Sequence, residues 1–238
     1  MSEQLEQVLG RNKIHFHQLV NFYPEQEKLL RFDFSKNNPA LTETILSDTG
    51  LLSQYINNQL QQSGSRYGIG GYNEERVLYN GNKIFEETGN VNSTVINNRS
   101  VHLGIDIWAP AGTKVYVPQG GMVHSFAFND QPGDYGATII LQHQIETIVF
   151  HTLYGHVSLK DLDQMAEGKY LNRGDVLGYI GTSSENGGWP PHLHFQIIAD
   201  MQLKKGDYPG VCLKEEREKY LYNCPDADLI VNMMQYAV

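Results

Sequence analysis

Two histidines one residue apart, His192 and His194, lie in the stretch WPPHLHFQII at residues 189–198. Aromatic and β-branched residues follow them, so the stretch predicts a strand at His192–Ile198. Alternation along a strand places both imidazoles on one face, with Cβ atoms about 6–7 Å apart, and the apolar side chains on the other. One imidazole would then bind a metal ion while the other faces its open coordination position. Taken alone, the stretch is equally compatible with two polar residues on a solvated sheet face.

A histidine and an aspartate four residues apart, His102 and Asp106, lie in the stretch HLGID. On an extended strand their side chains would be about 13 Å apart, too far to bind one ion at ligand distances of about 2 Å. The chain must therefore bend between them, and Gly104 is the residue that permits a bend. The simpler interpretation is a polar strand end with Asp106 in a turn.

A third histidine, His156, follows a β-prone run in the stretch TLYGHVS at residues 152–158. The Tyr-Gly-His corner places it where a strand ends and a loop begins, a position that catalytic groups often take. A lone histidine at such a rim is more often a surface residue. We interpret His151 as a bystander, and the pair His15 and His17 as packed or exposed side chains, since no acidic residue lies near that pair.

The elements that would position these residues are mostly strands. Residues 1–65 are expected to form a mainly helical segment, in which Leu29 and Leu30 are among the apolar positions. Residues 66–200 are expected to form an antiparallel, sandwich-like β domain, because short β-prone runs follow one another without intervening helices. Residues 201–238 are expected to be a C-terminal extension with a short helix, packed on the core. The predicted strands are 114–117, 121–128, 138–142, 147–154, 176–180 and 192–198, with a short helix near 158–166.

Composition excludes several function classes. The chain has 238 residues and a formal net charge of −9, which argues against nucleic acid as a partner. No window approaches the roughly 18 apolar residues of a membrane span, and no signal peptide is visible, which points to the cytoplasm unless a leader was removed. Cys212 and Cys224 are too few for a disulfide-dense scaffold, and whether they pair is left open.

The conjunction of these stretches in this order is more specific than any one of them. HLGID, LYGH and PPHLHF, with GDVLGYIGTSS before the last, resemble the M23 family of zinc metallopeptidases, of the lysostaphin and LytM type. The stretch APAGTKVY at residues 109–116 is similar to the family sequence after its first ligand pair. The resemblance covers roughly residues 66–198 and implies the duplicated hybrid motif β domain of that family.

The resemblance implies one Zn²⁺ ion bound by His102, Asp106 and His194, with His156 and His192 as the catalytic histidines. Two histidines and one carboxylate leave a fourth position open for water, as in catalytic zinc sites, and zinc lowers the pKa of that water toward about 7. Which of the two catalytic histidines acts as the general base is left open.

Possible substrate contacts are Trp189, Thr182 and Ser183, because the resemblance places their loop beside the substrate groove. Family members commonly have Gly-Pro before the HLH motif, so the bulkier Trp-Pro-Pro here would narrow the groove. Arg76 and Arg99 are candidates for binding a substrate carboxylate bidentately, although exposed arginines in salt bridges are the simpler interpretation. Some family members close the zinc site with an asparagine, and Asn73 is the residue here that would do so.

The resemblance implies a zinc-dependent endopeptidase acting on a peptide or peptidoglycan fragment. It would be cytoplasmic as the sequence stands, and periplasmic or extracellular if a leader was removed. The alternatives are a non-catalytic M23-like binding or regulatory module, or a cytoplasmic zinc amidohydrolase with a small substrate unrelated to the cell wall. All five site residues are present, which favours an enzyme.

Overall fold

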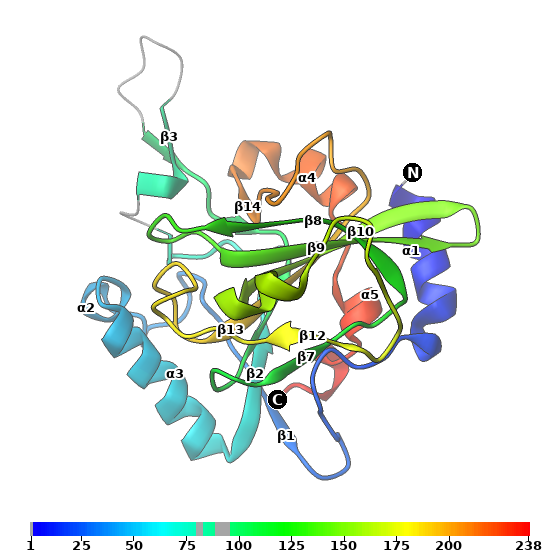
Figure 1. The fold of residues 1–238 in the computed structure, drawn as a ribbon. Coiled ribbons are helices and arrows are strands. Elements are labelled where there is room, and N and C mark those ends of the chain that lie inside the picture. The colour runs from blue at the N-terminus through cyan, green and yellow to red at the C-terminus, as the bar shows by residue number, and fades with distance from the viewer. Residues whose placement is uncertain (1, 80–82, 89–95) are drawn as a thin grey trace.

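An eight-stranded sheet forms the centre of the computed structural model, which describes residues 2–79, 83–88 and 96–238 (Figure 1). All neighbouring strands in it are antiparallel except the first two, which are parallel. The prediction of a mainly β, antiparallel fold is confirmed. The strands, in their order across the sheet, are β1 (Lys28–Arg31), β2 (Ser65–Gly70), β6 (Ile105–Trp108), β13 (His192–Ile198), β10 (Ile148–Val157), β9 (Gly136–Ile145), β8 (Gly121–Asn129) and β11 (Tyr170–Leu171).

Three two-stranded sheets and several short helices complete the described part of the chain. The sheets pair β7 (Lys114–Tyr116) with β12 (Val176–Tyr179), β5 (Val101–His102) with β14 (Val211–Cys212), and β3 (Glu86–Thr88) with β4 (Ile96–Asn98). The α-helices are α1 (Ser2–Asn12), α2 (Glu43–Leu46), α3 (Thr49–Ser63), α4 (Arg217–Asn223) and α5 (Asp228–Val231). The 3₁₀ helices are η1 (Lys13–His15), η2 (Lys83–Phe85), η3 (Leu159–Gln164), η4 (Lys214–Glu216) and η5 (Met234–Tyr236).

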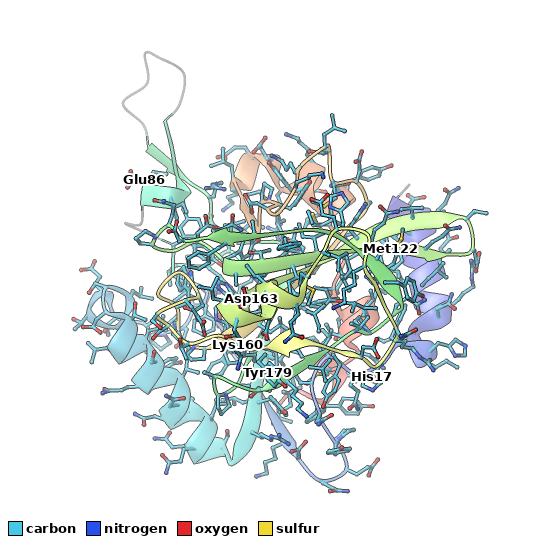
Figure 2. All side chains as sticks on the ribbon, viewed as in Figure 1. His17, Glu86, Met122, Lys160, Asp163 and Tyr179 are labelled. Atoms are coloured by element: carbon cyan, nitrogen blue, oxygen red, sulfur yellow. The ribbon has the colours of Figure 1, made fainter. Side chains whose placement is uncertain are left out.

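The six predicted strands all occur, and β13 has the predicted bounds. The predicted short helix near 158–166 is the 3₁₀ helix η3, which contacts β12. Its Asp161 carboxylate accepts a hydrogen bond from the Tyr179 backbone N–H, and Lys160 lies over the Tyr179 ring. Figure 2 shows Lys160 and Tyr179 next to each other, and Glu86 on the segment that projects from the body. Within the described residues, no helix is long and apolar enough to cross a membrane.

The N-terminal segment is less helical than the sequence predicts. Leu29 and Leu30, expected in a helix, lie in β1, which extends the main sheet in parallel to β2. Residues Thr49–Ser63 of this segment do form a helix, α3, which Asp48 caps at its N-terminus and Gly64, in the left-handed conformation, caps at its C-terminus. Apolar residues of the segment, including Leu5, belong to the same core as the strands. The segment therefore packs as part of one body.

Both faces of β13 are buried, although the sequence alternates between apolar and polar residues there. Leu193, Phe195 and Ile197 enter the main core, as the alternation predicts. The opposite face carries two histidines and a glutamine, and it is also buried. The alternative interpretation, two polar residues on a solvated sheet face, is therefore wrong. Buried polar groups need partners, so this face must hold a connected polar network.

Candidate metal and active site

Three side chains from neighbouring strands converge on one point: His102, Asp106 and His194. The β13–β6 register places His194 directly opposite Asp106, and His102 ends β5. The facing atoms are close together, with His102 Nε2 2.9 Å from His194 Nδ1, Asp106 Oδ1 3.1 Å from His194 Nδ1, and His102 Nε2 3.3 Å from Asp106 Oδ1. All three residues are buried.

Gly104 makes this convergence possible. It lies between β5 and β6, where the chain bends as the sequence predicts. A Cβ at this position would lie 2.6 Å from Cε1 of His194 and 2.7 Å from the Phe195 carbonyl oxygen. Only glycine lets the bend pass this close to the His194 ring.

The atoms of the histidine rings that face away from the cluster are held by the protein. Nδ1–H of His102 donates to the Gly71 carbonyl at 2.9 Å, and Nε2–H of His194 donates to Gln196 Oε1 at 3.0 Å. The facing nitrogens therefore carry the lone pairs. Burial lowers the pKa of His102 to about 3, so its ring is neutral at neutral pH.

These donors fit a zinc ion. Ligand atoms about 2.0–2.2 Å from a tetrahedral zinc lie about 3.2–3.6 Å from one another, close to the spacing of the three facing atoms. Partners that fix the outer ring nitrogens are a regular feature of zinc-binding histidines. Although burial alone would raise the pKa of Asp106, its neighbours, including the charged Arg76 guanidinium, hold that pKa well below its ordinary value, so the carboxylate is charged.

Two further histidines, His156 and His192, lie beside the cluster with ring centroids 4.2 Å apart. Each donates its Nδ1–H to a backbone carbonyl, His156 to Asn186 at 3.0 Å and His192 to Pro190 at 2.7 Å. In both rings Nε2 therefore carries the lone pair, and that of His192 lies 3.9 Å from Asp106 Oδ1. Burial lowers the pKa of both rings, which keeps them neutral and able to accept a proton.

The position of His156 depends on an irregularity at the end of β10. The register with β9 shifts between Tyr154 and Val157, and His156 has a φ of 64°, which is rare for residues other than glycine. The neighbouring Gly155 faces His194 across the ladder, and a Cβ there would lie 2.5 Å from the Tyr135 ring. Strained backbone of this kind is concentrated at functional sites.

A cavity of about 220 Å³ opens onto the five residues. Trp189 lines it together with Tyr79 and Phe85, whose rings contact one another and form an aromatic wall. Leu52 and Ile56 of α3 line it as well. Trp189 and Pro190 of the Trp-Pro-Pro stretch thus border the cavity.

The other predicted substrate contacts have different positions. Arg99 lines the cavity, with its guanidinium over the Phe85 ring. Thr182 and Ser183 are exposed and are not among the described residues that line it; Thr182 instead bonds Glu185. Asn73 accepts a hydrogen bond from Arg217 at 2.6 Å, so its side chain faces the C-terminal extension.

Arg76 is 3% exposed, so the simpler interpretation of it as an exposed salt-bridging residue is wrong. Its guanidinium donates to Asp106 Oδ2 at 2.5 Å and to Glu74 at 2.8 Å. It also donates to the Tyr79 hydroxyl at 3.2 Å. The guanidinium N–H groups of Arg76, which the sequence suggests as donors to a substrate carboxylate, therefore already donate to groups within the protein.

Three residues of the site were not identified from the sequence. Gln196 holds His194, Trp108 stacks on His192 with ring centroids 5.7 Å apart, and Tyr135 packs against His156 and His194. Gln196 shares the polar face of β13 with the two histidines, and that parity is a signal for its position. Nothing in the local sequence distinguishes Tyr135 or Trp108 from ordinary core aromatics.

The two cysteines and the remaining histidines lie outside the cluster. Cys212 and Cys224 are free and buried, and Sγ of Cys224 is 3.2 Å from the Gln196 amide nitrogen. His151 packs against His124, with ring centroids 5.0 Å apart. His15 is exposed, and His17 lies against Tyr116.

Comparison with known proteins identifies the part of the chain that carries this site. The model of peptidase family M23 matches residues 100–205. The DD-carboxypeptidase/endopeptidase Mpg of Neisseria meningitidis serogroup B is 31% identical over 127 residues, which cover 53% of this chain and 26% of that protein. This chain thus spans about a quarter of the length of this curated relative.

Two solved structures are also similar. A zinc containing peptidase from Vibrio cholerae is 27% identical with a TM-score of 0.33, over 42% of this chain and 28% of that one. The catalytic domain of the antimicrobial peptidase lysostaphin from Staphylococcus simulans is 19% identical with a TM-score of 0.40, over 71% of this chain and 96% of that one. On the family model and the sequence relative, residues 100–205 of this chain form a peptidase family M23 domain.

Proposed function

We propose that this chain is a zinc-dependent metalloendopeptidase that hydrolyses amide bonds in peptidoglycan or in peptides derived from it. The observation that carries the proposal is the pairing of a three-donor cluster with two neutral histidines whose Nε2 atoms carry lone pairs. The peptidase domain and the name of the neisserial relative, a DD-carboxypeptidase/endopeptidase, support the reaction class and the substrate.

In this proposal His102, Asp106 and His194 hold the ion. A bound zinc ion polarises the scissile carbonyl and activates a water molecule. His156 and His192 would handle one proton: Nε2 of one of the two rings accepts it from the attacking water, and the imidazolium so formed delivers it to the leaving amine, after which both rings are neutral again. Their Nδ1 bonds to backbone carbonyls keep both rings in the required tautomer and orientation throughout.

The test separates metal binding from proton transfer. We expect about one zinc per chain by metal analysis, and hydrolysis of muropeptides that stops on chelation and returns with Zn²⁺. The substitution His156→Ala should lower kcat by about 10²–10⁴-fold with zinc content unchanged, because general acid–base catalysis contributes a factor of that size. Wild-type hydrolysis by His156→Ala with zinc still bound would contradict the catalytic assignment.

The same assays distinguish the alternative functions. A non-catalytic binding module would take up zinc and bind muropeptides without releasing any product. An amidohydrolase with a small substrate unrelated to the cell wall would cleave model amides and leave both muropeptides and intact peptidoglycan uncut. The first result would exclude the proposed hydrolysis, and the second would exclude the proposed substrate.

A further inference from the structure

The carboxylate of Asp106 divides its two oxygens between different partners. Oδ1 faces His102 and His194 at 3.3 and 3.1 Å. Oδ2 faces away from them and accepts a hydrogen bond from Nη1 of Arg76 at 2.5 Å. Both side chains of this ion pair are 2% exposed, so water does not compete for either oxygen.

Arg76 is itself fixed from several directions. Nε donates to Glu74 at 2.8 Å, Nη1 also donates to the Tyr79 hydroxyl, and Nη2 donates to the Gly70 carbonyl at 3.4 Å. A Cβ at Gly71 would lie 1.7 Å from Nη2, so the backbone there leaves room for the guanidinium and for nothing larger. The planar fork therefore has one available orientation.

The fork is anchored to the N-terminal segment. The second oxygen of Glu74 accepts a hydrogen bond from the Phe34 backbone N–H at 3.1 Å, and the Phe34 ring lies 5.5 Å from the guanidinium carbon. A continuous chain of contacts thus runs from Phe34 through Glu74 and Arg76 to Asp106. Through these contacts, residues before the M23 domain help to fix the geometry of the site.

We propose that Arg76 is a positioning residue of the metal site, which holds Oδ2 of Asp106 so that Oδ1 alone is available to the ion. A carboxylate with two available oxygens binds a metal ion through one or both of them. By occupying one oxygen, Arg76 limits Asp106 to a single ligand atom and keeps the number of protein ligand atoms at three. This inference rests on the proposed metal site and adds a determinant of its coordination number.

The test replaces zinc by Co²⁺, whose visible absorption is strong in four-coordinate sites and weaker at higher coordination. The wild-type protein is expected to show the strong bands. In Arg76→Met the second oxygen is released, so the bands should weaken and kcat for a muropeptide should fall by about 10–100-fold. Arg76→Lys keeps the charge but lacks the fork, so it should not restore the wild-type spectrum.

Two other variants complete the test, one as a matched control and one as an independent way to disturb Arg76. Arg66→Met makes the same change on β2, in a side chain that is 53% exposed and pairs with Glu27, and should leave the spectrum unchanged. Glu74→Gln retains Arg76 but weakens its anchor, so it should shift the bands in the same direction even if Arg76→Met does not fold.

The outcomes separate this inference from the proposed function. If the wild-type protein binds no Co²⁺ or Zn²⁺, the metal site itself is wrong and both proposals fail. If it binds the ion and hydrolyses muropeptides, but Arg76→Met and Glu74→Gln keep the wild-type spectrum, only the positioning role fails. Restoration of the spectrum by Arg76→Lys would show that charge alone suffices and would also overturn it.

Discussion

At the scale of single residues, the site depends on Gly104, which has no side chain, as well as on the side chains that form the cluster. We expect Gly104→Ala to weaken zinc binding and lower the thermal midpoint, because its Cβ would collide with the His194 ring and with a backbone carbonyl that cannot move aside. Zinc titration and thermal unfolding measure the two effects.

Gly10 of α1 provides the matched control for this substitution. A Cβ there meets no atom within 4 Å. Gly10→Ala should therefore stabilise the protein by about 0.5–1 kcal/mol, because alanine is the better helix former, and leave zinc binding unchanged. Equal zinc affinity in both variants would show that the bend at Gly104 tolerates a side chain.

Sequence reasoning at this scale groups His102, Asp106 and His194 correctly in space, and places His156 and His192 beside them. Their roles remain predictions. Arg76 was misjudged because it lies in a charged stretch, YNEER, which is typical of a surface loop. Its burial follows from contacts with Glu74 and Asp106 that only the folded chain creates.

At the scale of elements, the hairpin of β9 and β10 carries a buried histidine, His143, that is not part of the cluster of His102, Asp106 and His194. His143 bonds the Thr152 hydroxyl at 2.7 Å and stacks on Phe150, and burial lowers its pKa to about 4. Between about pH 6.5 and 4 the unfolded chain therefore takes up a proton here that the folded chain does not. The free energy of unfolding should fall across this window by up to about 3 kcal/mol.

Chemical denaturation at several pH values checks this expectation. His143→Gln retains a hydrogen-bonding side chain without the titration, so its unfolding free energy should depend less steeply on pH between about 6.5 and 4. Each protein is referred to its own stability near neutral pH, where His143 is neutral in both the folded and unfolded states. If the unfolding free energy of His143→Gln depended on pH as steeply as that of the wild type, the acid sensitivity would come from groups other than His143.

The strands were predictable because their alternation and length are strong local signals, and β13 was found with its observed bounds. The short β1 was missed. Leu29 and Leu30 suit a helix as well as a strand, and its four residues form a strand because β2 and the chain end near Val238 bond to it. Such pairing is not encoded in the local sequence.

At the scale of the whole molecule, the cavity is assembled from distant parts of the chain. Leu52 and Ile56 come from α3, Tyr79 and Phe85 from the segment before the M23 domain, and Trp189 from the loop before β13. Sequence reasoning placed Trp189 at the groove. It had no means of finding the rest of the wall, which depends on how these segments pack.

This wall predicts a preference for small substrates. Trp189→Ala should raise kcat/KM for cross-linked muropeptides relative to a short linear peptide by several-fold, because removing the indole widens the cavity. Kinetics on the two substrate classes measures the ratio. Tyr170→Ala removes an aromatic ring that is 60% exposed and does not line the cavity, and it should leave the ratio unchanged. If Trp189→Ala and Tyr170→Ala gave the same ratio of kcat/KM values, the proposal that Trp189 limits the size of the substrate would be contradicted.

The order of strands in the sheet affects how the protein folds. β13 lies between β6 and β10 but follows both in the chain, so it can complete the sheet only after both have been synthesised. Until it does, β6 and β10 present unpaired edges, which are prone to aggregate. His194, one of the three proposed metal ligands, lies on that strand. The three donor side chains therefore come together only when β13 pairs with its neighbours. A chain in which β13 has not yet paired would lack the proposed metal site.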